Sequence, residues 1–115
     1  MDDRMRIADE EIFGPVVAVM GYSELTEAID YINQRPAPLV AYSFGPDYND
    51  FRSFVAYTRS GGVARNDFAA QMIPSAAPFG GVERSGMGAY HGKAGFDTFG
   101  HYRAVVGSDL PFSIT

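Results

Sequence analysis

The chain has 115 residues, of which 46% are hydrophobic and 20% are charged, an ordinary balance for one small globular domain. Its net charge of −5 at pH 7 excludes the basic surface needed to bind a nucleic-acid backbone. It contains no cysteine, which excludes disulfides, thiolate metal sites and thiol nucleophiles within these residues.

The N-terminal segment is charged, and the first regular elements follow it. No apolar run approaches the about 20 residues that cross a bilayer, so we expect a cytoplasmic protein without a membrane partner. Residues 16–20 (VVAVM) form a continuous apolar run, typical of a strand covered on both faces. Apolar residues at helical spacing from Leu25 to Ile32 then predict a helix, which Ser23 would cap and Pro36 would stop.

The same strand-and-helix pattern occurs a second time. Residues 39–44 predict a second strand, and Tyr48 to Thr58 predict a second helix, which a glycine pair ends before a third strand at residues 63–66. The order βαβαβ predicts an α/β fold with parallel strands and right-handed crossovers. Three strands are few for a parallel sheet, so we expect them to belong to a larger sheet whose edges are exposed in this chain.

Regular periodicity ends after the third strand. Residues 67–100 hold seven of the thirteen glycines and predict a shaped loop region with a short helix near His91. Residues 101–106 predict a C-terminal strand. The chain is thus divided into a βαβαβ part at 1–66, a Gly-rich loop region at 67–100, and a C-terminal strand and tail at 101–115.

The chemistry-bearing residues alone assign no catalytic group. Ser85 lacks the flanking glycine of a nucleophile elbow and is interpreted as a turn residue. His91 and His101 match no metal-ligand spacing, so no metal site is predicted. Glu10 and Glu11 are adjacent and would point to opposite faces if they lay on a strand, so only one of them could line a given site.

Several motifs in order resemble one family. Residues 10–16 (EEIFGPV) resemble a signature from the C-terminal half of aldehyde dehydrogenases, and residues 60–63 (SGGV) and 78–82 (PFGGV) resemble later family segments. Residues 90–93 (YHGK) and 95–99 (GFDTF) are most similar to the class 3 and coniferyl aldehyde dehydrogenase branch. The resemblance implies the C-terminal portion of the catalytic domain of such an enzyme.

The resemblance also implies roles for four residues. Glu11 would hydrogen-bond the nicotinamide ribose of NAD or NADP, Phe13 would pack beside it, Phe79 would line the tunnel for a small aldehyde substrate, and Asn66 would brace the backbone near the reacting centre. The cysteine nucleophile, the glutamate base and the dinucleotide-binding domain would precede Met1. We therefore expect this chain alone to be inactive and to bind no cofactor.

Three residues depart from the pattern of the branch. Glu83 and Arg84 stand where glycine and a small residue are common, and Gly100 stands where serine is common. An alternative function is an interaction module whose C-terminal strand pairs with another copy, giving a homo-oligomer or a strand-exchanged dimer. Independent cofactor binding through Glu11 and Phe13 is a third hypothesis, which the entropy cost of association disfavours.

Overall fold

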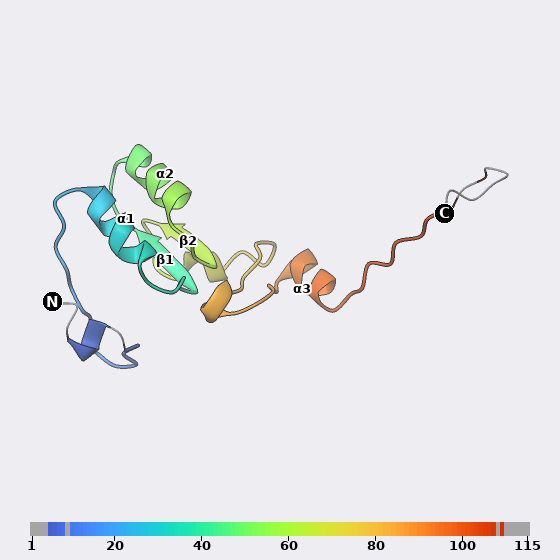
Figure 1. Ribbon diagram of the computed structural model, residues 1–115, viewed down its shortest axis with the longest axis horizontal. Coiled ribbons are helices and arrows are strands. Elements are labelled where there is room, and N and C mark those ends of the chain that lie inside the picture. The colour runs from blue at the N-terminus through green and yellow to red at the C-terminus, as the bar shows by residue number, and fades with distance from the viewer. Residues whose placement is uncertain (1–4, 9, 108, 110–115) are drawn as a thin grey trace.

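The computed structural model describes residues 5–8, 10–107 and 109. Two helices, α1 (Leu25–Asn33) and α2 (Tyr48–Tyr57), accompany a parallel sheet of two strands, β1 (Val40–Ser43) and β2 (Gly62–Arg65) (Figure 1). Short 3₁₀ turns and a third helix complete the described elements: η1 (Arg6–Ala8), η2 (Ala70–Met72), η3 (Glu83–Ser85) and α3 (Gly92–Thr98).

The second predicted strand, the second helix and the third strand are confirmed as one βαβ unit. β1 and β2 are parallel, with Val40 opposite Gly62 and Ser43 opposite Arg65, as the crossover through α2 requires. The buried apolar residues gather around this unit and α1: Ile29, Ala37, Phe54 and Ala64. These four residues form the small core of the described part of the chain.

The first predicted strand and the C-terminal strand are not formed, so within the described residues the order βαβαβ is wrong and the sheet has two strands. Most apolar side chains of residues 16–20 and 101–106 are exposed: Val17 is 81% exposed and Val106 is 93% exposed. A strand exists only through its ladder to another strand, so apolar sequence without a partner gives no sheet. The apolar composition of these two segments predicts buried side chains, whereas most of those side chains are exposed in this chain.

The helix starts differ in how they are capped. The predicted cap at Ser23 is wrong, because α1 begins after Glu24 and the Ser23 amide donates to the Glu27 carboxylate at 3.1 Å. α2 has a conventional cap, in which Asp47 Oδ1 accepts from the Asn49 amide at 2.7 Å.

Glycines allow the Gly-rich region to lie against the end of the βαβ unit. A Cβ atom on Gly61 would collide with the Gly80 carbonyl and would lie 2.9 Å from the Cα of Gly81. The backbones therefore touch where a side chain could not fit. The short helix expected near His91 is confirmed as α3, which begins at the next residue.

The chain as a whole is elongated. Its radius of gyration is 20.4 Å and its extents are 70 × 32 × 29 Å, whereas a compact chain of this length would have a radius of about 13 Å. The chain after α3 extends away from the sheet, whereas the segment before α1 lies on the opposite side of the molecule (Figure 1). Large apolar side chains in both are exposed, including Phe13, Val19, Phe99 and Val105.

Candidate functional site

Glu11 lies in an open cleft between the N-terminal segment and the Gly-rich region. The cleft has a volume of about 700 Å³, and its lining includes Glu10, Glu11, Arg84 and Ser85. The prediction that only one of the two glutamates could line a given site is wrong, because neither lies on a strand and both face this cleft. Glu10 is paired with Arg6 at 2.6 Å, which leaves Glu11 as the exposed carboxylate without a described partner.

Phe13 is placed outside the Glu11 cleft. Its ring is 93% exposed and does not belong to the lining of the cleft. An exposed phenyl ring costs free energy in water, so this side chain is suited to covering by a ligand or by further protein. Within this chain the two expected cofactor contacts are close in sequence and are not joined in one site.

The Asn66 side chain hydrogen-bonds the backbone of Gly45, just after β1 ends. Its Oδ1 accepts from the Gly45 amide at 2.8 Å and its Nδ2 donates to the Gly45 carbonyl at 3.0 Å. Its own amide continues the ladder to Ser43. Asn66 has a φ of 54°, a left-handed conformation that asparagine tolerates better than most residues. The Asn66 side chain thus clasps the chain that enters α2, and its bracing role near a reacting centre stays a prediction.

Phe79 belongs to an aromatic cluster in the Gly-rich region. Phe79 and Tyr90 exchange two backbone hydrogen bonds of 2.9 Å as an antiparallel bridge. Their rings meet edge to face at 5.5 Å, and the His91 ring stacks on Phe79 at 6.0 Å. Phe79 is half-buried, and the Tyr90 and His91 rings hold its ring in place.

Ser85 and Glu83 form a tight turn beside this region. Ser85 Oγ donates to the Val82 carbonyl at 2.7 Å and accepts from its amide at 2.9 Å, which confirms Ser85 as a turn residue. Glu83 has a φ of 56°, a conformation that favours glycine, the residue common in the resembling branch. The departure at Glu83 therefore falls on a strained backbone position.

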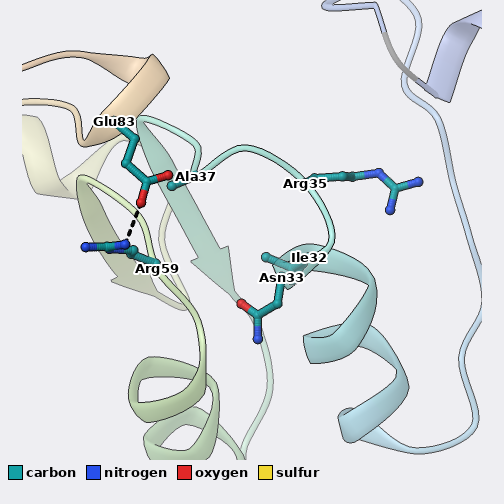
Figure 2. Close-up of a pocket in the computed structure, with 6 residues that line it drawn as sticks. All are labelled: Ile32, Asn33, Arg35, Ala37, Arg59 and Glu83. Carbon is teal, nitrogen blue, oxygen red and sulfur yellow. Dashed lines mark hydrogen bonds and ion pairs between the residues drawn. The ribbon is translucent and has the colours of Figure 1, made fainter.

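Sequence reasoning missed an ion pair that ties this turn to the βαβ unit. Arg59 Nη1 donates to Glu83 Oε1 at 2.5 Å, and both lie in a recess of about 260 Å³ whose lining also includes Ile32, Asn33, Arg35 and Ala37 (Figure 2). The partners are 24 residues apart, so no local pattern links them. The one signal was the unexpected acid at position 83.

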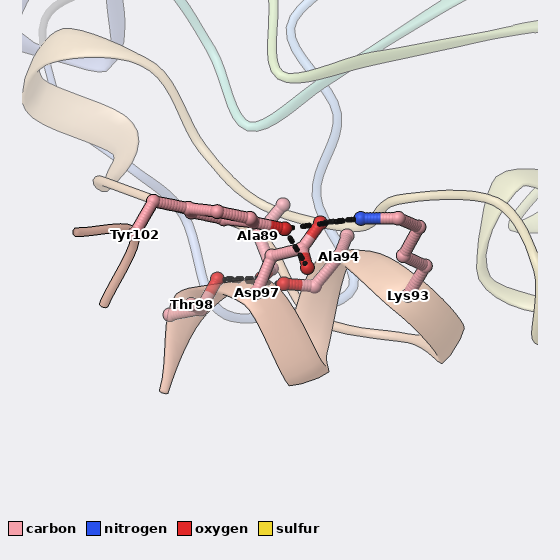
Figure 3. A network of polar contacts seen from close by, with 6 residues as sticks. All are labelled: Ala89, Lys93, Ala94, Asp97, Thr98 and Tyr102. Carbon is pink, nitrogen blue, oxygen red and sulfur yellow. Dashed lines mark hydrogen bonds and ion pairs between the residues drawn. The ribbon is translucent and has the colours of Figure 1, made fainter. Parts of the chain in front are cut away.

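A second missed network holds the C-terminal segment to α3. Lys93 Nζ donates to Asp97 Oδ2 and, at 3.3 Å, to the Tyr102 hydroxyl, which donates to Asp97 Oδ1 at 2.7 Å (Figure 3). The hydrogen bond from Lys93 lowers the pKa of Asp97, and the same bond raises the pKa of Lys93. The Lys93 and Asp97 side chains are 77% and 31% exposed, and the network joins the C-terminal segment to α3.

The four expected site residues are not assembled into one site in this chain. Phe13, Asn66 and Phe79 do not line the cleft that holds Glu11. In the described residues, no group of three or more histidine, aspartate or glutamate side chains is placed to hold a metal ion. No helix in the described part is long and apolar enough to cross a membrane. The four expected site residues therefore lie at separate places on the described part of the chain.

Comparison with known proteins decides the family. A model described as "Aldehyde dehydrogenase family" matches residues 1–105. The chain belongs to the aldehyde dehydrogenase family. The predicted branch is confirmed by relatives such as the dimeric NADP-preferring aldehyde dehydrogenase of Rattus norvegicus, 44% identical over 96% of this chain, and a probable coniferyl aldehyde dehydrogenase of Caulobacter vibrioides, 46% identical over 90%.

Solved structures of the family have the same fold over most of this chain. A substrate-bound Staphylococcus aureus AldH matches 96% of this chain and 26% of its own length, with a TM-score of 0.82 and 40% identity. An indole-3-acetaldehyde dehydrogenase in complex with NAD+ matches 86% of this chain and 20% of its own, with a TM-score of 0.76 and 33% identity. The chain spans 24% of the rat relative and 21% of the Caulobacter one.

Proposed function

We propose that this chain is the C-terminal part of the catalytic domain of an NAD(P)-dependent aldehyde dehydrogenase, which oxidises a small aldehyde to a carboxylic acid, and that it is inactive alone. The observation that carries this proposal is the family match over residues 1–105 in a chain without cysteine. Covalent attack on an aldehyde by this family's route needs a thiolate. That nucleophile must come from other residues.

The proposed contribution of this chain to cofactor binding centres on Glu11. An exposed carboxylate in an open cleft can accept two hydrogen bonds from the two hydroxyls of a ribose, and the exposed Phe13 ring offers apolar surface to the nicotinamide end. Bound NAD or NADP would accept the hydride from the substrate. Relatives described as NADP-preferring and a structure in complex with NAD+ support either cofactor.

The proposed roles of Phe79 and Asn66 concern shape. The Phe79 ring, held by Tyr90 and His91, would form one wall of the passage for the aldehyde. Asn66 would keep the Gly45 backbone in place beside the reacting centre. Two contacts without an adenosine-binding half do not offset the entropy of association, so we expect no cofactor to bind this chain alone.

The test is an assay of the purified chain with aldehyde and with NAD or NADP in turn, read by formation of the reduced cofactor. We expect no aldehyde-dependent signal. Measurable turnover that co-purifies with the chain would contradict the proposal. Calorimetry with NAD tests the binding part separately, where saturable binding at micromolar concentration would be the contrary result.

A second candidate function is an interaction module, with a cytoplasmic location and a second copy of the chain as partner. Residues 101–106 favour it, because Val105 and Val106 are 84% and 93% exposed on an unpaired segment. Pairing of these segments would give a homo-oligomer or a strand-exchanged dimer. A monomer in light scattering at every concentration would count against this candidate.

A further inference from the structure

Residues 79–90 form a compact loop whose two ends are joined. Phe79 and Tyr90 exchange two backbone hydrogen bonds of 2.9 Å across its neck. Inside the loop the backbone folds back on itself so closely that a Cβ atom on Gly80 would collide with the carbonyl oxygen of Gly88. A surface loop with joined ends and a filled interior is an Ω-loop. Because it is packed by its own contacts, this Ω-loop can change its position relative to the βαβ unit as one body.

The Ω-loop carries the proposed wall of the aldehyde passage at its neck. The Phe79 ring meets the Tyr90 ring edge to face at 5.5 Å, and the His91 ring stacks on Phe79 at 6.0 Å. Both ring contacts lie within the loop or at the residue that follows it. The position of the Phe79 ring therefore depends on where the Ω-loop lies against the βαβ unit.

Two contacts of different kinds join the Ω-loop to the βαβ unit. The backbone of Gly80 lies directly against Gly61, where no side chain would fit. Arg59 Nη1 donates to Glu83 Oε1 at 2.5 Å, across the recess shown in Figure 2. Within the described residues, this ion pair is the one hydrogen bond between the Ω-loop and the segment 40–65. The glycine contact has no directional bond of its own, so the ion pair is the contact that can fix the position of the loop.

The backbone conformation of Glu83 indicates that its side chain is needed for this contact. Its φ is 56°, a left-handed conformation that costs free energy for a residue with a Cβ atom and is accessible to glycine. Glycine is the residue common at this position in the resembling branch. Strained backbone positions persist where another demand maintains them, and they gather at functional sites. The described partner of the Glu83 carboxylate is Arg59, so the demand falls on the ion pair.

The ion pair is suited to a contact that both holds and releases the loop. Both side chains are exposed, and a pair at the surface shifts an equilibrium between two positions by up to about fivefold. Salt screens such a pair, because the Debye length falls from about 10 Å at 0.1 M to about 3 Å at 1 M. The fraction of chains with the loop held in place should therefore depend on ionic strength.

We propose that Arg59 and Glu83 are positioning residues, whose ion pair latches the Ω-loop to the βαβ unit and thereby sets the position of the Phe79 ring. The proposal rests on the proposed function, because it is as a wall of the aldehyde passage that Phe79 gives the latch its importance. When the latch is released, the loop and the ring move together away from the sheet. The width of the passage then changes, although neither Arg59 nor Glu83 touches the aldehyde.

The experiment measures how far the Ω-loop lies from α2 in the full chain. Because the chain has no cysteine, Arg52→Cys gives a single attachment point for a nitroxide label at an exposed position of α2. NMR then records how strongly the label accelerates the relaxation of the Phe79 ring protons and of the amides of residues 79–90. We expect Glu83→Gln to lower this enhancement in the ring and the loop together, through a fall of up to about fivefold in the ratio of held to released loop. The two hydrogen bonds between Phe79 and Tyr90 should persist.

Two further variants separate the latch from a general effect of charge. Arg84→Gln removes a charge from the next residue of the same turn, for which the described part of the chain holds no ion-pair partner. We expect it to leave the enhancement unchanged. The charge swap that combines Arg59→Glu with Glu83→Arg should restore the enhancement that Glu83→Gln lowers. Equal losses in Glu83→Gln and Arg84→Gln, or a swap that restores nothing, would overturn the latch.

A salt series on the labelled chain needs no change at Glu83 and so remains decisive if Glu83→Gln fails to fold. We expect 1 M NaCl to lower the enhancement in the same direction as Glu83→Gln, and an unchanged enhancement would overturn the proposal. A variant that lowers the free energy of unfolding but leaves the enhancement of the folded chain unchanged would overturn it too, because the pair would then only stabilise the fold. These measurements use no aldehyde or cofactor. Turnover by the chain alone would therefore contradict the proposed function and leave the latch standing, whereas a failed latch leaves the proposed function in place.

Discussion

The carboxamide of Asn66 closes a ring of two hydrogen bonds with the peptide groups of Gly45, accepting at 2.8 Å and donating at 3.0 Å. It does so from a left-handed backbone conformation with a φ of 54°. The side chain thus joins the end of β2 to the turn that follows β1, where the chain enters α2. Substitution at Asn66 can separate the contribution of its side-chain amide to stability from the contribution of its left-handed backbone conformation.

Asn66→Gly keeps the conformation accessible and removes the clasp, so we expect a loss of about 1 kcal/mol in the free energy of unfolding. Asn66→Ala removes the clasp and also strains the backbone, which adds about 1 kcal/mol more. Urea unfolding followed by circular dichroism measures both. An alanine variant as stable as the glycine variant would show that the conformation carries no strain.

Gly61→Ala should destabilise the chain by about 1–3 kcal/mol, the usual range for overpacking. The new Cβ would meet the Gly80 carbonyl and would stand 2.7 Å from the Leu39 carbonyl oxygen, and backbone atoms cannot turn away as a side chain can. The matched control is Gly21→Ala, where nothing lies within 4 Å. Thermal unfolding of the two variants should differ clearly, and similar melting temperatures would mean that the Gly-rich region does not lie against the βαβ unit.

Glu83→Gly should be more stable than Glu83→Ala by about 1 kcal/mol, because the position has a φ of 56° that glycine adopts without strain. Both variants lose the pair with Arg59, so their difference isolates the backbone. Arg59 and Glu83 are 70% and 47% exposed in their side chains, and such a pair contributes at most about 1 kcal/mol. Chemical denaturation of Glu83→Gln, which keeps the length of the side chain, reports the contribution of the charge.

The tether between α3 and Tyr102 should respond to pH at both ends of the scale. The pKa of Asp97 is lowered from its ordinary 3.8 by the hydrogen bond from Lys93, so its contribution is complete above about pH 4 and is lost as the pH falls through the lowered pKa. The pKa of Lys93 is raised from 10.5, so its contribution is complete below that pH and is lost as the pH rises through the raised pKa. An NMR titration of the Asp97 carboxyl should show the low midpoint, and Lys93→Met should move it back toward 3.8. No movement would mean that the ion pair is not formed in solution.

How far sequence predicts this molecule depends on whether a residue's partners are near it in the chain. The helical spacing from Tyr48 to Thr58 is a local signal, and α2 follows it closely. Residues 16–20 have an equally clear strand pattern, but no strand among the residues that the structure describes pairs with them. A sequence pattern predicts that a segment can form a strand, but the strand forms only where another strand pairs with it.

The residues of the candidate site could be named from the sequence, but the contacts between distant residues could not. Glu11, Phe13, Asn66 and Phe79 were named through resemblance, whereas the clasp on Gly45 and the pair between Arg59 and Glu83 join residues 21 and 24 positions apart. No periodicity connects such pairs. The positive φ at Glu83 could have been suspected, because an acid stood where glycine is common in the branch, but its partner could not.

The elongation of the chain affects how its size would be measured in solution. A radius of gyration of 20.4 Å is that of a compact protein with about three times as many residues. A single copy would therefore elute early from a sizing column, as though it were an assembly of several, and would sediment more slowly than a compact chain of the same mass. Mass must be determined by a method that does not depend on shape before any count of subunits is accepted.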